Sequence, residues 1–385
     1  MHAHESLRGR TLHLVEAHAC AWATLDALHA ARGDDDAIWA FGPPTNTRAL
    51  RAPNAASPHP PLQRPEFAWR TLRDRVRRDG APALIHCWSW RCLMLARLGA
   101  PRARRVASLF EPPPVGALSS AWARGAIRGV TRGTFGSHAL RDAWSALAPR
   151  TRDWAVAPAP VDPAQRCDAD ACRRRWGVRD GQRVVAFIGS RSRIADAPLA
   201  AYYLGLLTLS GADAVGVIPH DAHDHERTER FTERHGRRWR MLYERLPERD
   251  WIGAADVVVA VSPPALPAAP CARDRGDACA ALAWAAALRT PIIAADSPGV
   301  RSLLDEGSCA MLDANDRVGF AGALRDFLET GPDGAKIDRA ETLARERCDG
   351  ADFARAMRAL RGGDAGRGEP DNGQPTVPTT DAALA

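Results

Sequence analysis

Residues 282–307 have the sequence LAWAAALRTPIIAADSPGVRSLLDEG, which runs in the order helix, short buried strand, tight turn and helix. The Ala-rich run before Thr290 favours a helix, and the apolar run 292–295 is typical of a buried strand. In the turn, Asp296 or Ser297 can cap the next helix, and Pro298 suits its first position. Gly299 lets another group approach the backbone closely. Such caps also occur for stability alone. The stretch therefore predicts a strand–turn–helix unit of an α/β fold more strongly than it predicts a binding site.

The same alternation of short apolar strands and helical segments continues on both sides of this stretch. The predicted strands are 12–15, 37–41, 83–86, 106–110, 130–135, 154–158, 184–188, 214–218, 240–243, 257–261, 292–295 and 310–312. The predicted helices are 20–31, 66–78, 88–98, 137–146, 197–209, 226–235, 278–288, 300–305 and 318–329, with Ser137 as an N-cap. Strands separated by helices cannot pair as hairpins, so the sequence predicts parallel sheets covered by helices on both faces.

A Pro-rich connection, APAPVDPAQ at residues 157–165, divides the chain into two such series. We therefore expect an α/β protein with two Rossmann-like, doubly wound parallel-sheet domains, 1–165 and 166–361, that face a central cleft. The Gly- and Pro-rich segment 362–385 is predicted to be a disordered tail. The final helices, after about Asp338, are expected to pack back toward the first domain.

Composition places the chain among ordinary globular proteins. It has 385 residues, of which 45% are hydrophobic and 25% are charged. No apolar run reaches the roughly 18 residues that a membrane span requires, and the N-terminus does not resemble an export signal. Its nine cysteines are an odd number and are scattered, which is typical of reduced, buried thiols. We expect a soluble, cytoplasmic protein.

The net charge of +6 comes almost wholly from arginine, since Lys336 is the one lysine. The basic runs at 173–175 and 237–238 have only a single Trp each beside them, whereas a single-strand nucleic-acid groove needs several aromatic platforms. We therefore expect solvated arginine faces and no nucleic-acid partner.

A second strand end carries residues suited to anion binding. The strand in VVAFIGSRSR, residues 184–193, ends at Gly189 and Ser190, and Arg191 and Arg193 follow. Guanidinium groups offer a fixed fork of donors that matches phosphate oxygens, and ligands of open parallel sheets bind at the carboxyl ends of strands. Arg191 and Arg193 are thus candidates for a diphosphate clamp, with ordinary surface arginines as the alternative.

Taken together, these segments resemble the donor domain of the GT-B glycosyltransferases, in particular the retaining enzymes of family 4. The resemblance rests on FIGSRSR at 187–193, AADVVVAVS at 254–262, WAAALRTPIIAAD at 284–296 and SCAMLDAND at 308–316. In the first half it rests on layout, with ALIHCWS at 83–89 and FGSHALRD at 135–142. The resemblance implies transfer of a sugar from a nucleotide-diphosphate sugar, without a metal or another cofactor, to a glycan, lipid or small-molecule acceptor held by the first domain, with peripheral membrane contact allowed for.

The residues implied by this resemblance fall into two groups. The donor-binding residues are Gly189, Ser190, Arg191, Arg193, Ser262, Trp284, Ser297, Pro298, Gly299 and Val300. The catalytic candidates are His86, Glu111 and Asp277. His86 ends a strand and Glu111 follows one, where the first domain is expected to face the cleft. A capped core histidine and a turn-forming acid are the alternatives for His86 and Glu111.

The sequence differs from the family at two positions that bind the sugar donor. Family members carry two glutamates eight residues apart, and the corresponding positions here are Gly276 and Trp284, although Asp277 can stand in for the first. An indole N–H donates and cannot accept a hydrogen bond from a ribose hydroxyl. Trp284 either closes the donor pocket with its ring or packs in the core. The rival hypothesis is therefore a glycosyltransferase-like protein that binds a nucleotide or a partner without catalysis.

Two further clusters are weaker candidates. Asp168 and Asp170 match a metal-binding D-x-D, yet they lie beside the linker at a helix start. The histidines of HDAHDH, residues 220–225, could bind zinc or iron, although a polar loop is the commoner case. A metal enzyme built on this cluster is a third hypothesis.

Overall fold

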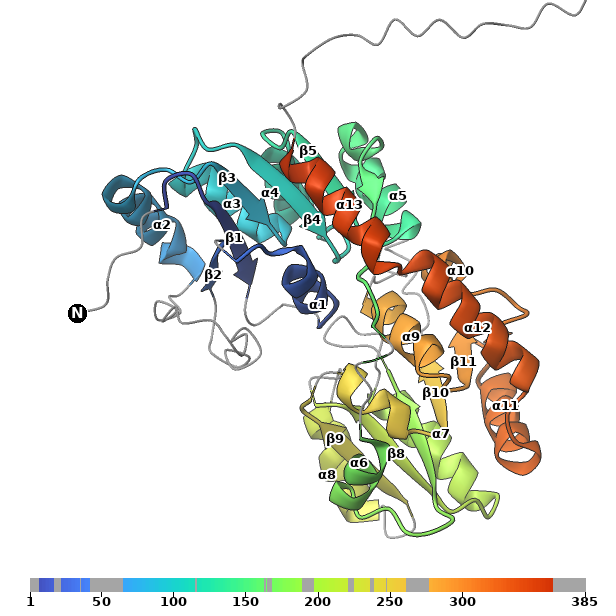
Figure 1. The fold of residues 1–385 in the computed structure, drawn as a ribbon. Coiled ribbons are helices and arrows are strands. Elements are labelled where there is room, and N and C mark those ends of the chain that lie inside the picture. Colours follow the sequence, from blue (N-terminus) through green and yellow to red (C-terminus); the bar gives the residue numbers. More distant parts are fainter. Residues whose placement is uncertain are drawn as a thin grey trace, which may run out of the picture.

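The computed structural model describes residues 7–16, 22–34, 36–41, 65–114, 116–162, 164, 168–188, 197–220, 225–235, 239–246, 248–260 and 277–362. These residues form two parallel sheets, each with helices on both faces (Figure 1). The expected fold of two Rossmann-like domains is confirmed.

The first sheet has six parallel strands in the order β2-β1-β3-β4-β5-β6. Their bounds are β1 Thr11–Glu16, β2 Ala37–Phe41, β3 Leu84–Cys87, β4 Arg105–Leu109, β5 Arg132–Phe135 and β6 Ala155–Val156. The connecting helices are α1 Trp22–Ala31, α2 Pro65–Asp79, α3 Trp90–Gly99, α4 Ala117–Ile127 and α5 His138–Leu147, followed by a short 3₁₀ turn, η2, at Pro149–Thr151. The strand order reverses between β1 and β3, which is where such sheets leave a crevice.

The second sheet also has six parallel strands, in the order β12-β11-β10-β7-β8-β9. The strands are β7 Arg183–Phe187, β8 Ala214–Pro219, β9 Arg240–Glu244, β10 Val257–Ala260, β11 Ile292–Ala295 and β12 Ala310–Leu312. Its helices are α6 Ala169–Arg175, α7 Ala197–Leu209, α8 His225–His235, α9 Asp277–Ala287, α10 Pro298–Leu303 and α11 Arg317–Thr330, with 3₁₀ turns η3 at Glu248–Asp250 and η4 at Ile252–Ala254. The order reverses between β7 and β10, at the strand that precedes Arg191 and Arg193.

Both sheets are buried on both faces, because successive strand residues point to opposite sides. In β7, Val184 and Ala186 pack with α9 and α12, whereas Val185 and Phe187 pack with α7 and α11. Burying a side chain of this size contributes roughly 1.5–3 kcal/mol. This explains why the strands appear in the sequence as nearly continuous apolar runs.

The twelve predicted strands are all present, and most bounds shift by one or two residues. Helix α4 was not predicted, because Gly116, Ser119 and Gly125 weaken its helical pattern and its buried side consists of small residues and one isoleucine. Helix α10 begins earlier than predicted, since Ser297 is its N-cap and Pro298 its first residue.

The last two helices divide between the domains. Helix α12, Gly334–Arg347, packs on α9 of the second domain, whereas α13, Gly350–Arg361, returns to the first domain. Figure 1 shows α13 beside the first sheet. There Phe353, Met357 and Leu360 share a core with residues of β1, β3 and β4. The final helices were expected to pack back toward the first domain, and α13 does so. It is therefore part of the first domain's core although it follows the second domain in sequence.

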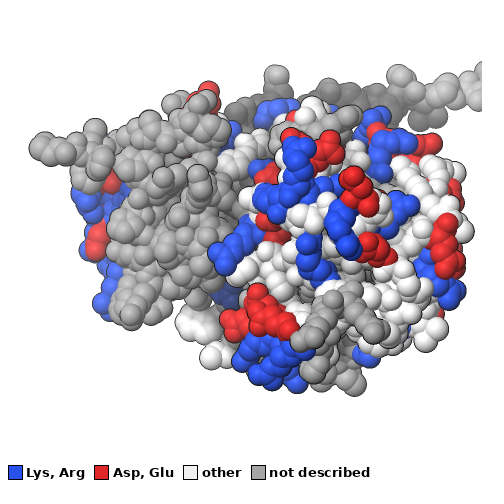
Figure 2. Space-filling view, turned by 90° about the horizontal axis from the view of Figure 1, so that it is seen from below, with Lys and Arg blue, Asp and Glu red and all other residues white. Residues whose placement is uncertain are grey.

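The surface and the cysteines agree with the composition. In the view of Figure 2, basic and acidic side chains lie interleaved over the second domain. Cys87, Cys92, Cys172, Cys309 and Cys348 are buried free thiols. Among the described helices, none combines the length and the apolar character that a bilayer span needs.

Candidate functional site

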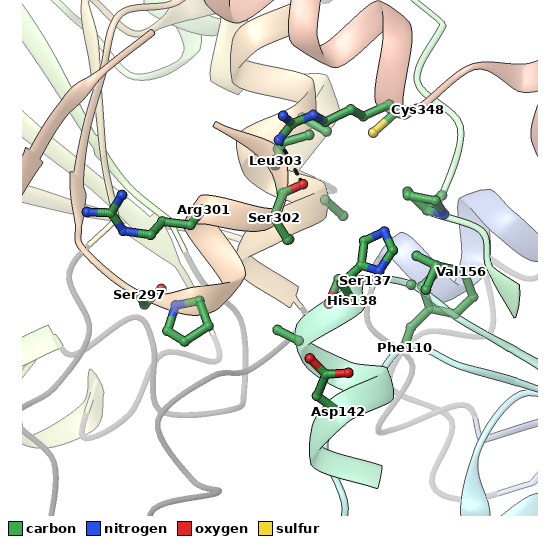
Figure 3. Close-up of a pocket in the computed structure, with 18 of the residues that line it drawn as sticks. Phe110, Ser137, His138, Asp142, Val156, Ser297, Arg301, Ser302, Leu303 and Cys348 are labelled. Carbon is green, nitrogen blue, oxygen red and sulfur yellow. Dashed lines mark hydrogen bonds between the residues drawn. The ribbon is translucent and has the colours of Figure 1, made fainter. Parts of the chain in front are cut away.

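A cavity of about 1010 Å³ lies between the two domains. Residues that follow β4, β5 and β6 form its wall on the first domain, and residues that follow β11 form its wall on the second (Figure 3). Parallel sheets bind ligands at the carboxyl ends of their strands, so the cavity occupies the expected place for a substrate site. We call it the interdomain pocket.

The wall on the first domain is the start of α5. Ser137 caps this helix, and its hydroxyl accepts a hydrogen bond from the Leu140 N–H at 3.2 Å. His138 and Asp142, one turn apart and both exposed, come from α5 and line the pocket (Figure 3). Together they place an imidazole and a carboxylate where hydroxyl groups of a substrate could be bound.

Gly136 allows the floor of this wall to close. A Cβ at this position would lie 2.5 Å from Cδ1 of Phe110, which is closer than real side chains approach. Both residues line the pocket. Any larger residue at position 136 would therefore displace the Phe110 ring.

The wall on the second domain is the turn after β11. The Ser297 hydroxyl accepts a hydrogen bond from the Val300 N–H at 3.3 Å, which makes Ser297, and not Asp296, the cap of α10. Asp296 instead binds Arg301, whose NH2 group lies 2.8 Å from Oδ2. This hydrogen-bonded guanidinium lowers the pKa of the Asp296 carboxyl. The carboxylate and the guanidinium thus form a fixed ion pair at the pocket edge.

Further lining comes from α9 and from the α12–α13 junction. Ala280 and Ala283 present small side chains on α9, which keeps the pocket wide. Arg347 donates to the Ser302 carbonyl oxygen at 3.0 Å, as drawn in Figure 3. Cys348 lies beside it, and burial raises the pKa of its thiol to about 12. Burial thus favours the protonated form of this thiol.

The predicted donor-binding residues are distributed unevenly. Ser297 and Pro298 line the pocket, whereas Gly299 and Val300 are buried behind them. Gly189, Ser190, Arg191, Arg193 and Ser262 lie outside the described residues. Asp277 is the first residue of α9, and its side chain is not described.

Trp284 lies in the core. Its side chain is 4% exposed and packs with buried residues of β10, β11 and α12. Of the two alternatives for Trp284, its burial favours packing in the core. The residues of α9 that line the pocket are Ala280 and Ala283.

His86 also lies in the interior, and this corrects the expectation that it faces the cleft. The imidazole is fully buried between the first sheet and α13, and its Nε2 is 2.8 Å from the Ser108 hydroxyl. Burial holds the pKa of His86 well below its usual value. It is a core histidine.

Glu111 accepts hydrogen bonds that hold neighbouring elements of the first domain together. Its Oε1 accepts a hydrogen bond from the Trp90 N–H at 3.2 Å, at the start of α3, and its carbonyl oxygen accepts one from the Trp144 indole at 2.8 Å. It does not appear among the residues that line the pocket.

The sequence analysis did not name several polar residues that line the pocket, among them His138, Asp142, Arg301, Ser302 and Arg347. The stretch FGSHALRD could have indicated His138 and Asp142 as site residues. It contains the helix cap Ser137, and a capped helix that follows a strand begins at the edge of the sheet where ligands bind. Nothing local marks Arg347, which lies about 200 residues further along the chain.

The two weaker clusters have simple explanations where they are described. The Asp168 side chain accepts a hydrogen bond from the Ala171 N–H at 2.9 Å and so caps α6. His220 has its Nε2 at 3.1 Å from Arg245, and residues 221–224 lie outside the described part of the chain. Over the described residues, no group of three potential metal ligands occurs.

Comparison with solved structures identifies the fold. No family model matches the sequence, and no curated protein matches it significantly. Solved structures match over nearly the whole chain. The Anabaena protein HepE in complex with UDP-glucose is 14% identical, with a TM-score of 0.74 over 92% of this chain and 99% of its own.

Two synthases are similar as well. Sucrose-phosphate synthase from Thermosynechococcus elongatus is 14% identical, with a TM-score of 0.62 over 91% of this chain and 98% of its own. The UDP-forming α,α-trehalose-phosphate synthase from Burkholderia vietnamiensis is 13% identical, with a TM-score of 0.60 over 92% and 98% of the two chains. The chain therefore has the GT-B fold, as the sequence resemblance indicated.

Proposed function

We propose that this GT-B chain is a glycosyltransferase that moves a sugar from a nucleotide-diphosphate sugar to an acceptor bound by the first domain. The interdomain pocket carries the proposal, because it joins the carboxyl edges of both sheets in a fold whose solved examples include one with UDP-glucose bound. Its volume is within the range of small-molecule sites, and it opens to groups from both domains.

Transfer of a sugar from a nucleotide sugar is favoured by cationic groups near the donor phosphates. When the sugar–oxygen bond breaks, negative charge grows on the departing nucleoside diphosphate, and positive groups held nearby lower the barrier. Arg191 and Arg193 follow β7 by a few residues, and β7 lies at the switch point of the second sheet. We therefore propose that Arg191 and Arg193 bind the diphosphate of the donor.

The opposite wall suits hydroxyl groups. The Asp142 carboxylate accepts hydrogen bonds, and the two ring nitrogens of His138 are further hydrogen-bonding groups. Because both come from α5 of the first domain, they are placed to hold the acceptor or the transferred sugar while the second domain holds the nucleotide.

A protein that binds the donor without turnover is the second candidate, and Trp284 favours it. Family 4 enzymes have a carboxylate at this position, whereas here the indole is 4% exposed and packs in the core. The free, buried cysteines support the expected cytoplasmic location for either function.

The test separates binding from turnover. UDP-, GDP- and ADP-glucose should be screened by thermal shift, since a ligand at 100 times its Kd stabilises the fold by about 2.7 kcal/mol. Release of nucleoside diphosphate with the preferred donor and candidate acceptors then measures turnover. Stabilisation with no release in the presence of any acceptor would favour the binding protein, and no stabilisation by any donor would refute both.

Arg191→Ala and Arg193→Ala test the clamp. Each should weaken binding of the preferred donor by about 1.5–3 kcal/mol, the usual worth of a hydrogen bond to a charged group. Arg179→Ala is the matched control, because Arg179 pairs with Asp213 on the surface and is 73% exposed. Isothermal titration should show the control unchanged. Equal affinity in all three variants would remove the phosphate role.

A further inference from the structure

A second, smaller cavity lies at the opposite end of β11 from the interdomain pocket. Its volume is about 140 Å³, and Asp326, Thr330 and Asp333 form an exposed rim between α11 and α12. Residues that precede β11 and β12 line it, whereas residues that follow β11 line the interdomain pocket. The four residues of β11 span about 13 Å at roughly 3.3 Å per residue. We call this second space the amino-edge cavity.

The floor of the amino-edge cavity is apolar. Ile292 and Ile293 belong to the cores on opposite faces of the second sheet, and both line the cavity, which lies across the end of the strand. Phe327 of α11 and Ile337 of α12 add further apolar surface. A cavity of roughly 150 Å³ lined by such side chains takes up benzene. The amino-edge cavity therefore has room for one small ring or a short branched chain.

Two hydrogen-bond donors in the wall of this cavity lack a protein partner. Thr290 is 6% exposed, and no described residue bonds to its hydroxyl. Lys336, the one lysine of the chain, lines the cavity from the first turn of α12. Its ammonium forms no hydrogen bond or ion pair within the described part of the chain. Buried polar groups are normally hydrogen-bonded, so this pair points to an acceptor that enters the cavity from outside.

The other ionisable groups of the cavity are already compensated or neutral. The Asp333 carboxylate caps α12 and accepts two hydrogen bonds from backbone N–H groups of its first turn, at 3.0 and 3.4 Å. Asp326 lies 3.4 Å from the Arg325 guanidinium. Burial raises the pKa of the Cys309 thiol to about 11, which favours the neutral thiol near Lys336. The Lys336 ammonium is thus the charge of the described cavity wall that a ligand can still neutralise.

We propose that the amino-edge cavity binds a small apolar monocarboxylate of about the size of benzoate, with its carboxylate on Lys336 and Thr290 and its apolar body on the floor. An ammonium and a hydroxyl both donate to a carboxylate, and such charge-assisted hydrogen bonds are stronger than neutral ones. One carboxylate neutralises the ammonium. A second negative charge on the ligand would be repelled by the carboxylates at the rim.

Helix α12 lines both cavities. Lys336 and Ile337 lie at the amino-edge cavity, and Arg347, at the other end of the helix, lines the interdomain pocket and donates to the Ser302 carbonyl oxygen. A ligand of the amino-edge cavity would therefore contact an element that reaches the interdomain pocket. Its binding does not depend on the proposed transferase function.

Titration of the full chain with benzoate tests the head group. Isothermal titration should show one saturable site for benzoate, and benzyl alcohol and benzylamine should bind at least about tenfold more weakly, because neither brings a negative charge to Lys336. Lys336→Met keeps the length of the side chain and should weaken benzoate binding by at least about tenfold. Thr290→Val should weaken it by about threefold or more. Arg345→Met is the matched control, because Arg345 is 65% exposed on the same helix and pairs with Glu341.

Ala323→Leu tests the location. Ala323 lines the cavity from α11, and the larger side chain would fill the space that the ring needs, so benzoate binding should be lost. Ala335→Leu is the control, since Ala335 is exposed on α12 and should leave binding unchanged. Circular dichroism checks the fold of each variant, and Lys336→Met still tests the site if Ala323→Leu does not fold.

Four results would overturn the proposal. Benzoate could show no saturable binding, or it could bind equally well to the Lys336→Met variant. Stronger binding of benzylamine than of benzoate would make the carboxylates at the rim the ligands. Full benzoate binding by a folded Ala323→Leu variant would place the ligand elsewhere, outside the amino-edge cavity.

Discussion

At the scale of single residues, Trp284 contributes more to the fold than to the site. Its indole is 4% exposed and belongs to the core cluster on one face of the second sheet. A side chain of this size in an Ala-rich helix stabilises the core by its buried area. The pocket side of α9 is left to alanines, which give room and no polar grip.

Replacing Trp284 by Glu tests this placement. The variant should be destabilised by several kcal/mol, because a carboxylate would replace apolar contacts in the core. Denaturant unfolding measures the loss. Phe231→Glu is the control, since Phe231 is 51% exposed on α8 and its replacement should cost far less. Unchanged stability of the Trp284 variant would return the indole to the pocket.

At the scale of elements, a polar layer lies between the first sheet and its covering helices α1 and α13. His13 on β1, His86 on β3, Ser108 on β4 and Thr134 on β5 are buried side chains in this layer. Ser108 lies 2.8 Å from both the His86 ring and the Thr134 hydroxyl. This hydrogen-bonded row is contacted by Met357 of α13, whose sulfur is 3.9 Å from the Ser108 hydroxyl.

The end of α13 is held by a charged group of residues. Asp36 lies 3.1 Å from His13 Nε2 and 2.9 Å from the Arg361 guanidinium. The Trp88 indole donates to His13 Nδ1 at 3.0 Å, so the neutral ring carries its proton on Nε2 and donates it to Asp36. Asp36 and Arg361 therefore tie the last turn of α13 to β1.

Acid should weaken this layer. Burial lowers the pKa of His13 and of His86, and Arg361 and Arg32 act in the same direction on His13, although Asp36 opposes them. Burial acts to raise the pKa of Asp36, but hydrogen bonds from His13 and Gly33 outweigh it and the pKa is lowered. All three groups bind fewer protons in the folded chain than in the unfolded one. The stability they give is complete above about pH 6.5 for the histidines and is lost as the pH falls.

His13→Gln isolates the effect. The free energy of unfolding of the unaltered chain should fall between about pH 7.5 and about pH 5, and that of the variant should fall less. Urea unfolding at the two pH values measures both slopes. His138→Gln is the control, because His138 is exposed and its removal should leave the slope unchanged. Equal slopes for His13→Gln and the unaltered chain would contradict this assignment.

At the scale of the whole molecule, two chain crossings join the domains side by side. The Val161 N–H, in the first crossing, donates to the Cys348 carbonyl oxygen, in the second, at 3.3 Å. Pro158, Ala159 and Cys348 of these crossings also line the interdomain pocket. Any rotation of one domain against the other must therefore change the pocket wall itself.

Truncation tests the return of α13. A chain that ends at Cys348 loses Phe353, Met357 and Leu360 from the core of the first domain. Its unfolding free energy should fall by at least about 4 kcal/mol, given roughly 1.5–3 kcal/mol for each buried side chain. A chain that ends at Gly362 is the control and should keep its stability, since residues 363–385 are predicted from composition to be disordered. Similar stability of the two truncated chains would show that α13 is dispensable.

The sequence by itself determined the strands, the turns and most helices. Apolar runs that end at turn residues mark the strands, and Ser137 caps its helix through a bond to a residue three positions away, which is a local interaction. Only the tertiary structure decided that Trp284 and His86 are core, that Arg347 meets helix α10, and that α13 belongs to the first domain. These facts depend on which face of an element meets a partner far along the chain, and local pattern does not carry that information.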